Sequence, residues 1–251
     1  MPGAKILILA AAFVGGAAGA ARAQKPAPAP AADSMRMAGM ADHAMDDMHG
    51  AGMDVNMAKH MELTPERAAT HEDSVRALKV AAELKRAIAK YQDTTAAVAD
   101  GYHMFLPNVK QQRVYHFTNT GRAFKEAFRF NPAEPTSLLY KRGTDGKLHL
   151  LGAMYTMPRR ASMDRLNDRV PLGIARWHKH VSWCLPKKGE SERFSERTAD
   201  GKPKFGPESA IATKAACDAV DGEFHPTLFG WMLHANVFEG TELGTIFGEE
   251  H

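Results

Sequence analysis

The segment from Trp177 to Pro186 reads Trp-His-Lys-His-Val-Ser-Trp-Cys-Leu-Pro and holds the residues best suited to bind a metal ion. Successive side chains of a β-strand point to opposite faces. Alternation therefore predicts one face with His178, His180, Ser182 and Cys184, and an opposite face with Trp177, Lys179, Val181 and Trp183. Two imidazoles at this spacing lie roughly 7 Å apart at their Cα atoms, close enough to converge on one first-row metal ion. The segment thus predicts a metal site on a strand.

Two further histidines are candidates to complete this site. In segment 228–238 every second residue from Phe229 to Val237 is apolar, which leaves His234 on the opposite face together with Met232. His116 belongs to another expected strand, at 114–119. Three neutral imidazoles with an open fourth position form the pattern of a catalytic or exchangeable metal site, and a neighbouring methionine favours copper. The alternative for each histidine is an ordinary hydrogen-bonded residue of the core or surface.

The chain has two cysteines, Cys184 and Cys217. We predict that they form a disulfide, which the chain-entropy model values at roughly 3 to 4 kcal/mol. The alternative is that Cys184 is a thiolate ligand of the metal. If Cys184 is bonded to Cys217, the metal site has to recruit His116 or His234 from neighbouring strands.

Residues 35–61 contain eight methionines and three histidines among Gly, Ala and Asp. This composition cannot bury enough surface to offset chain entropy, so we predict a disordered arm. Thioethers select Cu(I), whereas imidazole and carboxylate also accept Cu(II), so the arm is predicted to capture copper or silver. Its candidate ligands are Met35, Met37, Met40, His43, Met45, Met48 and His49. The alternative is a spacer whose methionines are incidental or sacrificial towards oxidants.

The N-terminus predicts export. Lys5, the apolar run 6–21 and the small-x-small pattern Ala21-Arg22-Ala23 are typical of a secretory signal peptide over residues 1–23. A Pro/Ala linker follows at 24–34, and no later segment reaches the roughly 18 apolar residues of a membrane span. Cleavage removes two of the 32 basic residues and none of the 29 acidic ones, so the formal net charge falls from +3 to +1. We expect a periplasmic or secreted protein that does not bind nucleic acid.

Residues 62–251 are predicted to form a single α+β domain, with N-terminal helices packed on a mainly antiparallel sheet. Thr64 and Pro65 form a helix start signal, and a second helical piece at 94–100 ends at Gly101. The first helix is expected to pack on the core through one face, formed by Val75, Leu78, Ala82, Lys85, Ile88 and Ala89. Two-residue alternation then predicts strands at 114–119, 137–141, 148–156, 174–184 and 228–238, with a hairpin turn at 143–146. The charges at Arg159, Arg160, Asp164, Arg165, Asp168 and Arg169 have the spacing of a solvated helical face, and an anion-binding surface is the alternative.

Four sequence pieces between Tyr91 and Pro186 carry a family resemblance. They are Tyr-Gln-Asp-Thr-Thr-Ala-Ala-Val-Ala-Asp-Gly-Tyr at 91–102, Tyr-His-Phe-Thr-Asn at 115–119, Phe-Asn-Pro-Ala-Glu-Pro-Thr-Ser-Leu-Leu-Tyr at 130–140, and Trp-His-Lys-His at 177–180. These resemble a group of uncharacterised secreted bacterial proteins, which implies that His116, His178 and His180 belong to one fold and implies no activity. The arm resembles the Met/His-rich stretches of periplasmic copper-resistance proteins, in runs such as Met45-Asp46-Asp47-Met48-His49.

These patterns predict an exported protein that binds a transition metal, copper first and zinc as the alternative, in capture, resistance or delivery. A copper-handling protein is its candidate partner. One alternative is a mononuclear His-ligated metalloenzyme with water in the open position. Another is a secreted structural or interaction domain without metal. The sequence holds no G-x-S-x-G elbow, P-loop, G-x-G-x-x-G or H-E-x-x-H motif, so it leaves catalysis open.

Overall fold

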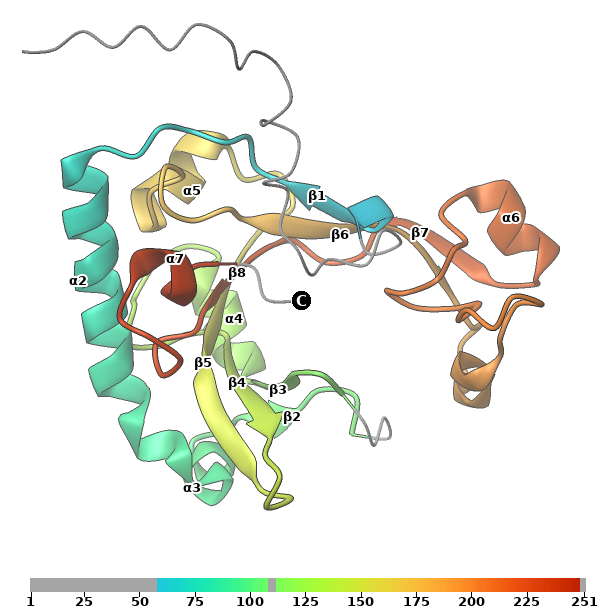
Figure 1. The fold of residues 1–251 in the computed structure, drawn as a ribbon, viewed down its shortest axis with the longest axis horizontal. Helices are drawn as coiled ribbons and strands as arrows, with labels where there is room; N and C mark the ends of the chain where they lie inside the picture. The colour runs from blue at the N-terminus through green and yellow to red at the C-terminus, as the bar shows by residue number, and fades with distance from the viewer. Residues whose placement is uncertain (1–57, 108–111, 249–251) are drawn as a thin grey trace, which may run out of the picture. The chain divides into compact units, whose positions relative to one another are not determined.

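The computed structural model describes residues 58–107 and 112–248. They form an α+β fold around an eight-stranded sheet of order β1-β6-β8-β5-β4-β3-β2, in which β7 also pairs with β6 (Figure 1). All strand pairings among these residues are antiparallel. The predicted signal peptide, the linker and residues 35–57 of the arm lie outside the described residues.

The strands are β1 (Met61–Leu63), β2 (His103–Met104), β3 (Tyr115–Thr118), β4 (Ser137–Arg142), β5 (Leu148–Met157), β6 (His178–Leu185), β7 (Glu223–Thr227) and β8 (Trp231–Ala235). The α-helices are α2 (His71–Ile88), α3 (Thr94–Ala99), α4 (Thr120–Glu126), α5 (Met163–Arg169), α6 (Lys214–Ala219) and α7 (Leu243–Ile246). Two 3-10 helices, η1 (Ala89–Gln92) and η2 (Ser191–Ser195), complete the elements. In the described part of the chain, no helix has the length and apolar character to cross a membrane.

Helix α2 runs along one face of the sheet beside β5 and closes the main core (Figure 1). It buries Ala77, Ala81, Leu84 and Ile88, which recur at helical spacing. The predicted helix face was right only at Ile88, because Val75 and Leu78 are 52% and 48% exposed and Ala82 and Ala89 are exposed as well. The face that packs in the core therefore combines two alanines with the larger Leu84 and Ile88.

The predicted helix start was also wrong, because Thr64 does not cap α2. Its hydroxyl accepts a hydrogen bond from the Trp177 backbone N–H at 3.1 Å, and the residue is completely buried. The helix begins at His71 behind a capping box in which the Thr70 hydroxyl and the Asp73 carboxylate each accept from the other's backbone N–H. These bonds satisfy donors that the first helical turn otherwise leaves unpaired.

Thr70→Ala is expected to lower the free energy of unfolding by about 1 kcal/mol, because the Asp73 N–H loses its acceptor. Urea unfolding followed by circular dichroism measures the loss. Thr70→Ser keeps the hydroxyl and serves as the control. Equal stability of the alanine and serine variants would contradict the role of this cap.

Most of the expected strands are present. The segments predicted at 114–119, 137–141 and 148–156 correspond to β3, β4 and β5, and the turn at 143–146 joins β4 to β5. The two later strands are shorter than expected, since β6 begins at His178 and β8 spans Trp231–Ala235. Gly101 has φ +83° behind α3, as a helix-ending glycine requires. The strand β1 was not predicted, and residues 58–61 belong to the described fold, where the His60 carbonyl accepts a hydrogen bond from the Val181 backbone N–H.

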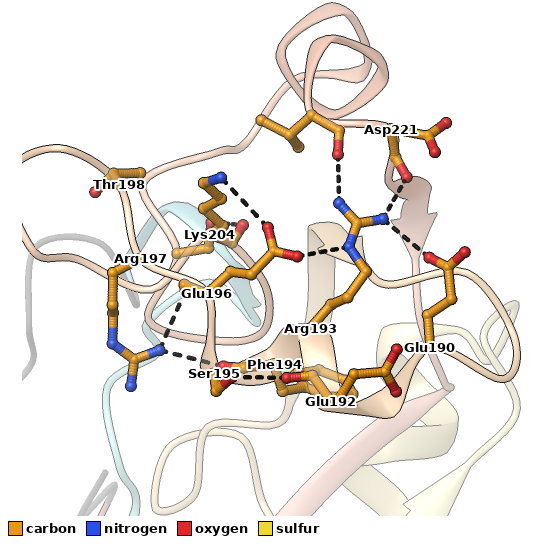
Figure 2. Close-up of polar contacts among 12 residues, drawn as sticks. Glu190, Glu192, Arg193, Phe194, Ser195, Glu196, Arg197, Thr198, Lys204 and Asp221 are labelled. Atoms are coloured by element: carbon orange, nitrogen blue, oxygen red, sulfur yellow. Dashed lines mark hydrogen bonds and ion pairs between the residues drawn. The ribbon is translucent and has the colours of Figure 1, made fainter.

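Beyond the sheet, residues 186–222 form a small disulfide lobe between β6 and β7, with α6 at its edge (Figure 1). The predicted Cys184–Cys217 disulfide is confirmed. A separate small core holds the lobe, made of Cys184 in β6 together with Phe205 and Cys217, with the partly buried Ile211, Val220 and Phe224 packed against them. Figure 2 shows Arg193 at the centre of its polar contacts, where the guanidinium donates to the carboxylates of Glu190 and Glu196.

Candidate metal centre

Three of the predicted histidines lie together on the neighbouring strands β6 and β8. His178 lies directly opposite Met232, so both side chains point to the same face of the sheet. His180 and His234 are each two residues further along their strands and share this face. The ring centroids of His178 and His180 are 5.4 Å apart, and those of His178 and His234 are 5.1 Å apart. The structure therefore brings these three imidazoles into contact.

The fourth predicted histidine, His116, reaches the same place from β3. Three strand spacings separate β3 from β8, which is about 14 Å in a flat sheet. The His116 and His234 ring centroids are nevertheless 5.7 Å apart. The sheet must therefore curve towards this face, which is concave. We call His116, His234, His178 and His180, in this order of contact, the histidine row.

The spacing of the row is compatible with shared metal ions. Two imidazoles bound to one tetrahedral ion at about 2.0 to 2.1 Å hold their ring centroids roughly 5 Å apart. The neighbouring centroids of the row are 5.1 to 5.7 Å apart. Within residues 58–107 and 112–248, no three His, Cys, Asp or Glu side chains form a group that could hold a metal ion. The row therefore offers neighbouring pairs of imidazoles rather than a ready three-histidine centre.

The surroundings of the row are apolar and rich in thioethers. Leu139, Met154 and Met232 form a buried cluster on this face, separate from the main core. His178 is 1% exposed, whereas the other three rings are half-buried. Both ends of the row are thus partly solvated, and a ligand at His178 would lie in a largely dry interior, where electrostatic interactions are less screened.

Alternation along β6 fails at one residue. Ser182 has φ +57°, in the left-handed region, which interrupts the extended backbone. The Trp183 ring consequently lies on the side of His180, with ring centroids 4.9 Å apart, and not on the opposite face as predicted. The Trp183 indole N–H donates to the His60 carbonyl at 3.3 Å, which fixes the ring beside the row.

Two other side chains of β6 point away from the row. Lys179 is directed to the opposite face, where its ammonium lies 4.3 Å from the centroid of the Trp231 ring and 2.9 Å from the Glu62 carboxylate. Cys184 is bonded to Cys217, so its sulfur is no thiolate ligand. The positive charge and the sulfur of this strand are thus both engaged elsewhere.

Two methionines lie beside the row that the sequence did not predict to be there. Met154 lies opposite His234, and Met61 lies opposite His180. Met154 belongs to a strand that is apolar on both faces, so alternation did not single it out. Met61 was assigned to the arm because its composition continues that of residues 35–57. The one available signal was the short alternation of Met61-Glu62-Leu63.

No protein-family model, curated protein or solved structure matches the chain. The fold and the site define a class, namely an α+β protein whose antiparallel sheet carries four adjacent histidines on its concave face. The resemblance of residues 91–186 to secreted bacterial proteins and that of the arm to copper-resistance proteins stay predictions.

Proposed function

We propose that this protein is an exported transition-metal binding protein, that its metal is copper, and that it acts in capture, resistance or delivery. The observation that carries the proposal is the histidine row, which joins residues 116, 178, 180 and 234 from three strands in ring-to-ring contact. Imidazole binds copper and zinc alike, so the choice of copper rests on the thioethers of the arm and of the concave face. The disulfide supports an oxidising compartment.

The row and the arm have different roles in this proposal. The arm, through Met35, Met37, Met40, His43, Met45, Met48 and His49, supplies soft and borderline ligands for capture. The row stores the ion or passes it to a copper-handling protein. The observed pairs of imidazoles favour binding over catalysis, because a metalloenzyme of the predicted kind needs three protein ligands around an open position.

Metal stoichiometry of the full chain tests this function. The arm is silenced by substitution, because deletion up to residue 61 would also remove Met61 of β1 and the described residues 58–60 before it. The arm-silent chain carries leucine at Met35, Met37, Met40, Met45, Met48, Met53 and Met57, and glutamine at His43 and His49. We expect it to retain bound copper, measured by elemental analysis after dialysis.

His180→Gln combined with His234→Gln in the arm-silent chain is expected to weaken copper binding at least about tenfold, since even outer-shell substitutions in metal sites cost 10- to 100-fold. Both residues are half-buried, so the variant should fold, and circular dichroism checks this. His103→Gln with His149→Gln, at exposed positions, is the matched control. Loss of all copper on silencing the arm alone would overturn the folded site.

A second candidate function is an interaction domain without metal, and one surface feature favours it. Phe124 and Phe128 on and beside α4 are 71% and 73% exposed, with ring centroids 5.3 Å apart. Lys125 and Arg129 line the same shallow hollow. Exposed aromatic pairs next to basic residues are typical of contact surfaces. Absence of bound metal from both the full chain and the arm-silent chain would favour this function.

A further inference from the structure

We propose that the concave face binds Cu(I) through three cross-strand pairs, each made of one methionine and one histidine. The pairs are Met61 with His180, Met232 with His178, and Met154 with His234. This inference rests on the proposed function and gives it an oxidation state, two further ligands and a direction of entry.

The register of the strands places the two residues of each pair opposite each other. In each pair the two residues are direct partners on adjacent antiparallel strands. Directly opposite side chains share a face and have Cβ atoms about 4.5 to 5.5 Å apart. A thioether sulfur and an imidazole nitrogen that start from this separation can both reach one ion. Three of the four histidines of the row therefore have a methionine as their cross-strand neighbour.

The chemistry of a methionine–histidine pair selects a soft monovalent ion. Thioethers favour Cu(I), and they are poor ligands for zinc, which prefers thiolate, imidazole and carboxylate. Both ligands of a pair are neutral, so they suit a single positive charge in a dry site. Cu(I) also accepts fewer ligands than zinc does, which fits a face where the described His, Cys, Asp and Glu side chains form no group of three. Ag(I) shares these preferences.

Burial gives the three pairs an order. Met61 and His180 are half-buried and form the outer pair. In the other two pairs Met232, His178 and Met154 are 6%, 1% and 7% exposed and His234 is half-buried, so each of these inner pairs has at least one buried member. Met61 is also the last methionine of the Met-rich segment and is held in β1. The outer pair thus contains the residue at which the Met-rich sequence ends and the row begins. The Cu(I) ion enters the row at this pair by exchanging its previous ligands for Met61 and His180, and its charge and oxidation state do not change.

Trp183 provides a readout that is specific to the outer pair. Its ring lies 4.9 Å from that of His180, so an ion bound there should quench the indole fluorescence. The arm-silent chain is titrated with Ag(I), a redox-stable substitute for Cu(I), and separately with Zn(II). Calorimetry gives the affinities, and Trp183→Phe assigns the fluorescence signal.

Met61→Leu and Met154→Leu are each expected to weaken Ag(I) binding by about tenfold or more and to leave Zn(II) binding unchanged, because only the soft ligand is lost. Leucine conserves the volume, so the fold should tolerate both changes. Met157→Leu is the matched control, since Met157 lies on the same strand and its side chain is buried in the main core.

The outcomes separate this inference from the proposed function. Unchanged Ag(I) affinity in both methionine variants, together with weakened binding in His180→Gln, would overturn the pairs and keep the histidine site. An arm-silent chain that binds none of Ag(I), Cu(II) and Zn(II) would overturn the proposed function itself. Loss of Ag(I) and Zn(II) binding together in Met61→Leu would overturn the claim that the thioether selects the soft ion.

Discussion

Replacing Cys184 and Cys217 by serine is expected to lower the free energy of unfolding by about 3 to 4 kcal/mol and to unfold the disulfide lobe first. The lobe's core has three buried members, and two of them are the bonded cysteines. The third, Phe205, packs against the guanidinium of Arg193 at 4.9 Å from its ring centroid. A core this small cannot order residues 186–222 by apolar burial alone.

The polar contacts in Figure 2 do not replace the disulfide. Arg193 bonds the carboxylates of Glu190 and Glu196, and it also donates to the carbonyls of Val220 and Asp221. Both carboxylates are partly solvated, so each ion pair contributes little net stability. The backbone bonds join η2 to the turn before β7. They position the lobe once the disulfide has reduced the entropy of its unfolded chain.

Limited trypsin digestion measures the expected opening, because the lobe is rich in lysine and arginine. The double serine variant should be cleaved within 186–222 much faster than the wild-type protein, and urea unfolding gives the loss of free energy. The wild-type protein treated with a reductant should behave like the variant, whereas the variant itself should not respond to it. If the variant were cleaved at the wild-type rate, the disulfide would not be what keeps the lobe ordered.

Local sequence patterns predicted the strands and their faces well, for a physical reason. The period of a strand is two residues, so alternation in 228–238 correctly separated the buried Trp231 and Leu233 from His234. The convergence of His116 with His234 depends on the curvature of the sheet across β4 and β5. Curvature is a property of several strands together, so no single segment encodes it.

The predictions that proved wrong concern residues whose environment depends on tertiary contacts. The helix face was misjudged because the contacts of α2 with the core bury Ala77, Ala81 and Leu84 and leave Val75 and Leu78 exposed. Trp183 changed sides because Ser182 adopts a left-handed backbone conformation. Arg169 was expected on a solvated helical face but is 7% exposed. Its side chain is turned inward towards the buried Glu126 of another helix. Each outcome depends on a contact that is distant in sequence.

The second large effect that we expect comes from Glu126, whose carboxyl group is 3% exposed. Burial raises the pKa of Glu126 from its ordinary value of 4.5 to about 7, although hydrogen bonds from Thr136 and Thr156 and the charge of Arg169 act in the opposite direction. Arg169 lies 3.9 Å from the carboxylate and donates to the Glu126 backbone carbonyl. Burial also lowers the pKa of Arg169, so the environment disfavours both charges.

The sign of the pH dependence follows from the raised pKa. Between about pH 4.5 and pH 7 the folded protein holds a proton on Glu126 that the unfolded chain has released. The stability that this proton contributes is complete below pH 4.5 and is lost as the pH rises through 7. The loss amounts to about 3 to 4 kcal/mol at most, since one pKa unit corresponds to about 1.4 kcal/mol. The contribution of Glu126 should then be level above pH 7.

Glu126→Gln is expected to remove this decline, because the amide stays neutral at every pH and keeps a side chain of the same size. Urea unfolding of both proteins from pH 4.5 to pH 8 gives the difference in the free energy of unfolding. That difference should grow with pH and then level off, with the glutamine variant the more stable protein at pH 8. Glu134→Gln, at an exposed carboxylate, is the control and should leave the profile of the wild-type protein unchanged. Parallel profiles for Glu126→Gln and the wild-type protein would mean that Glu126 is ionised throughout this range, and Arg169 would then have to stabilise its charge fully.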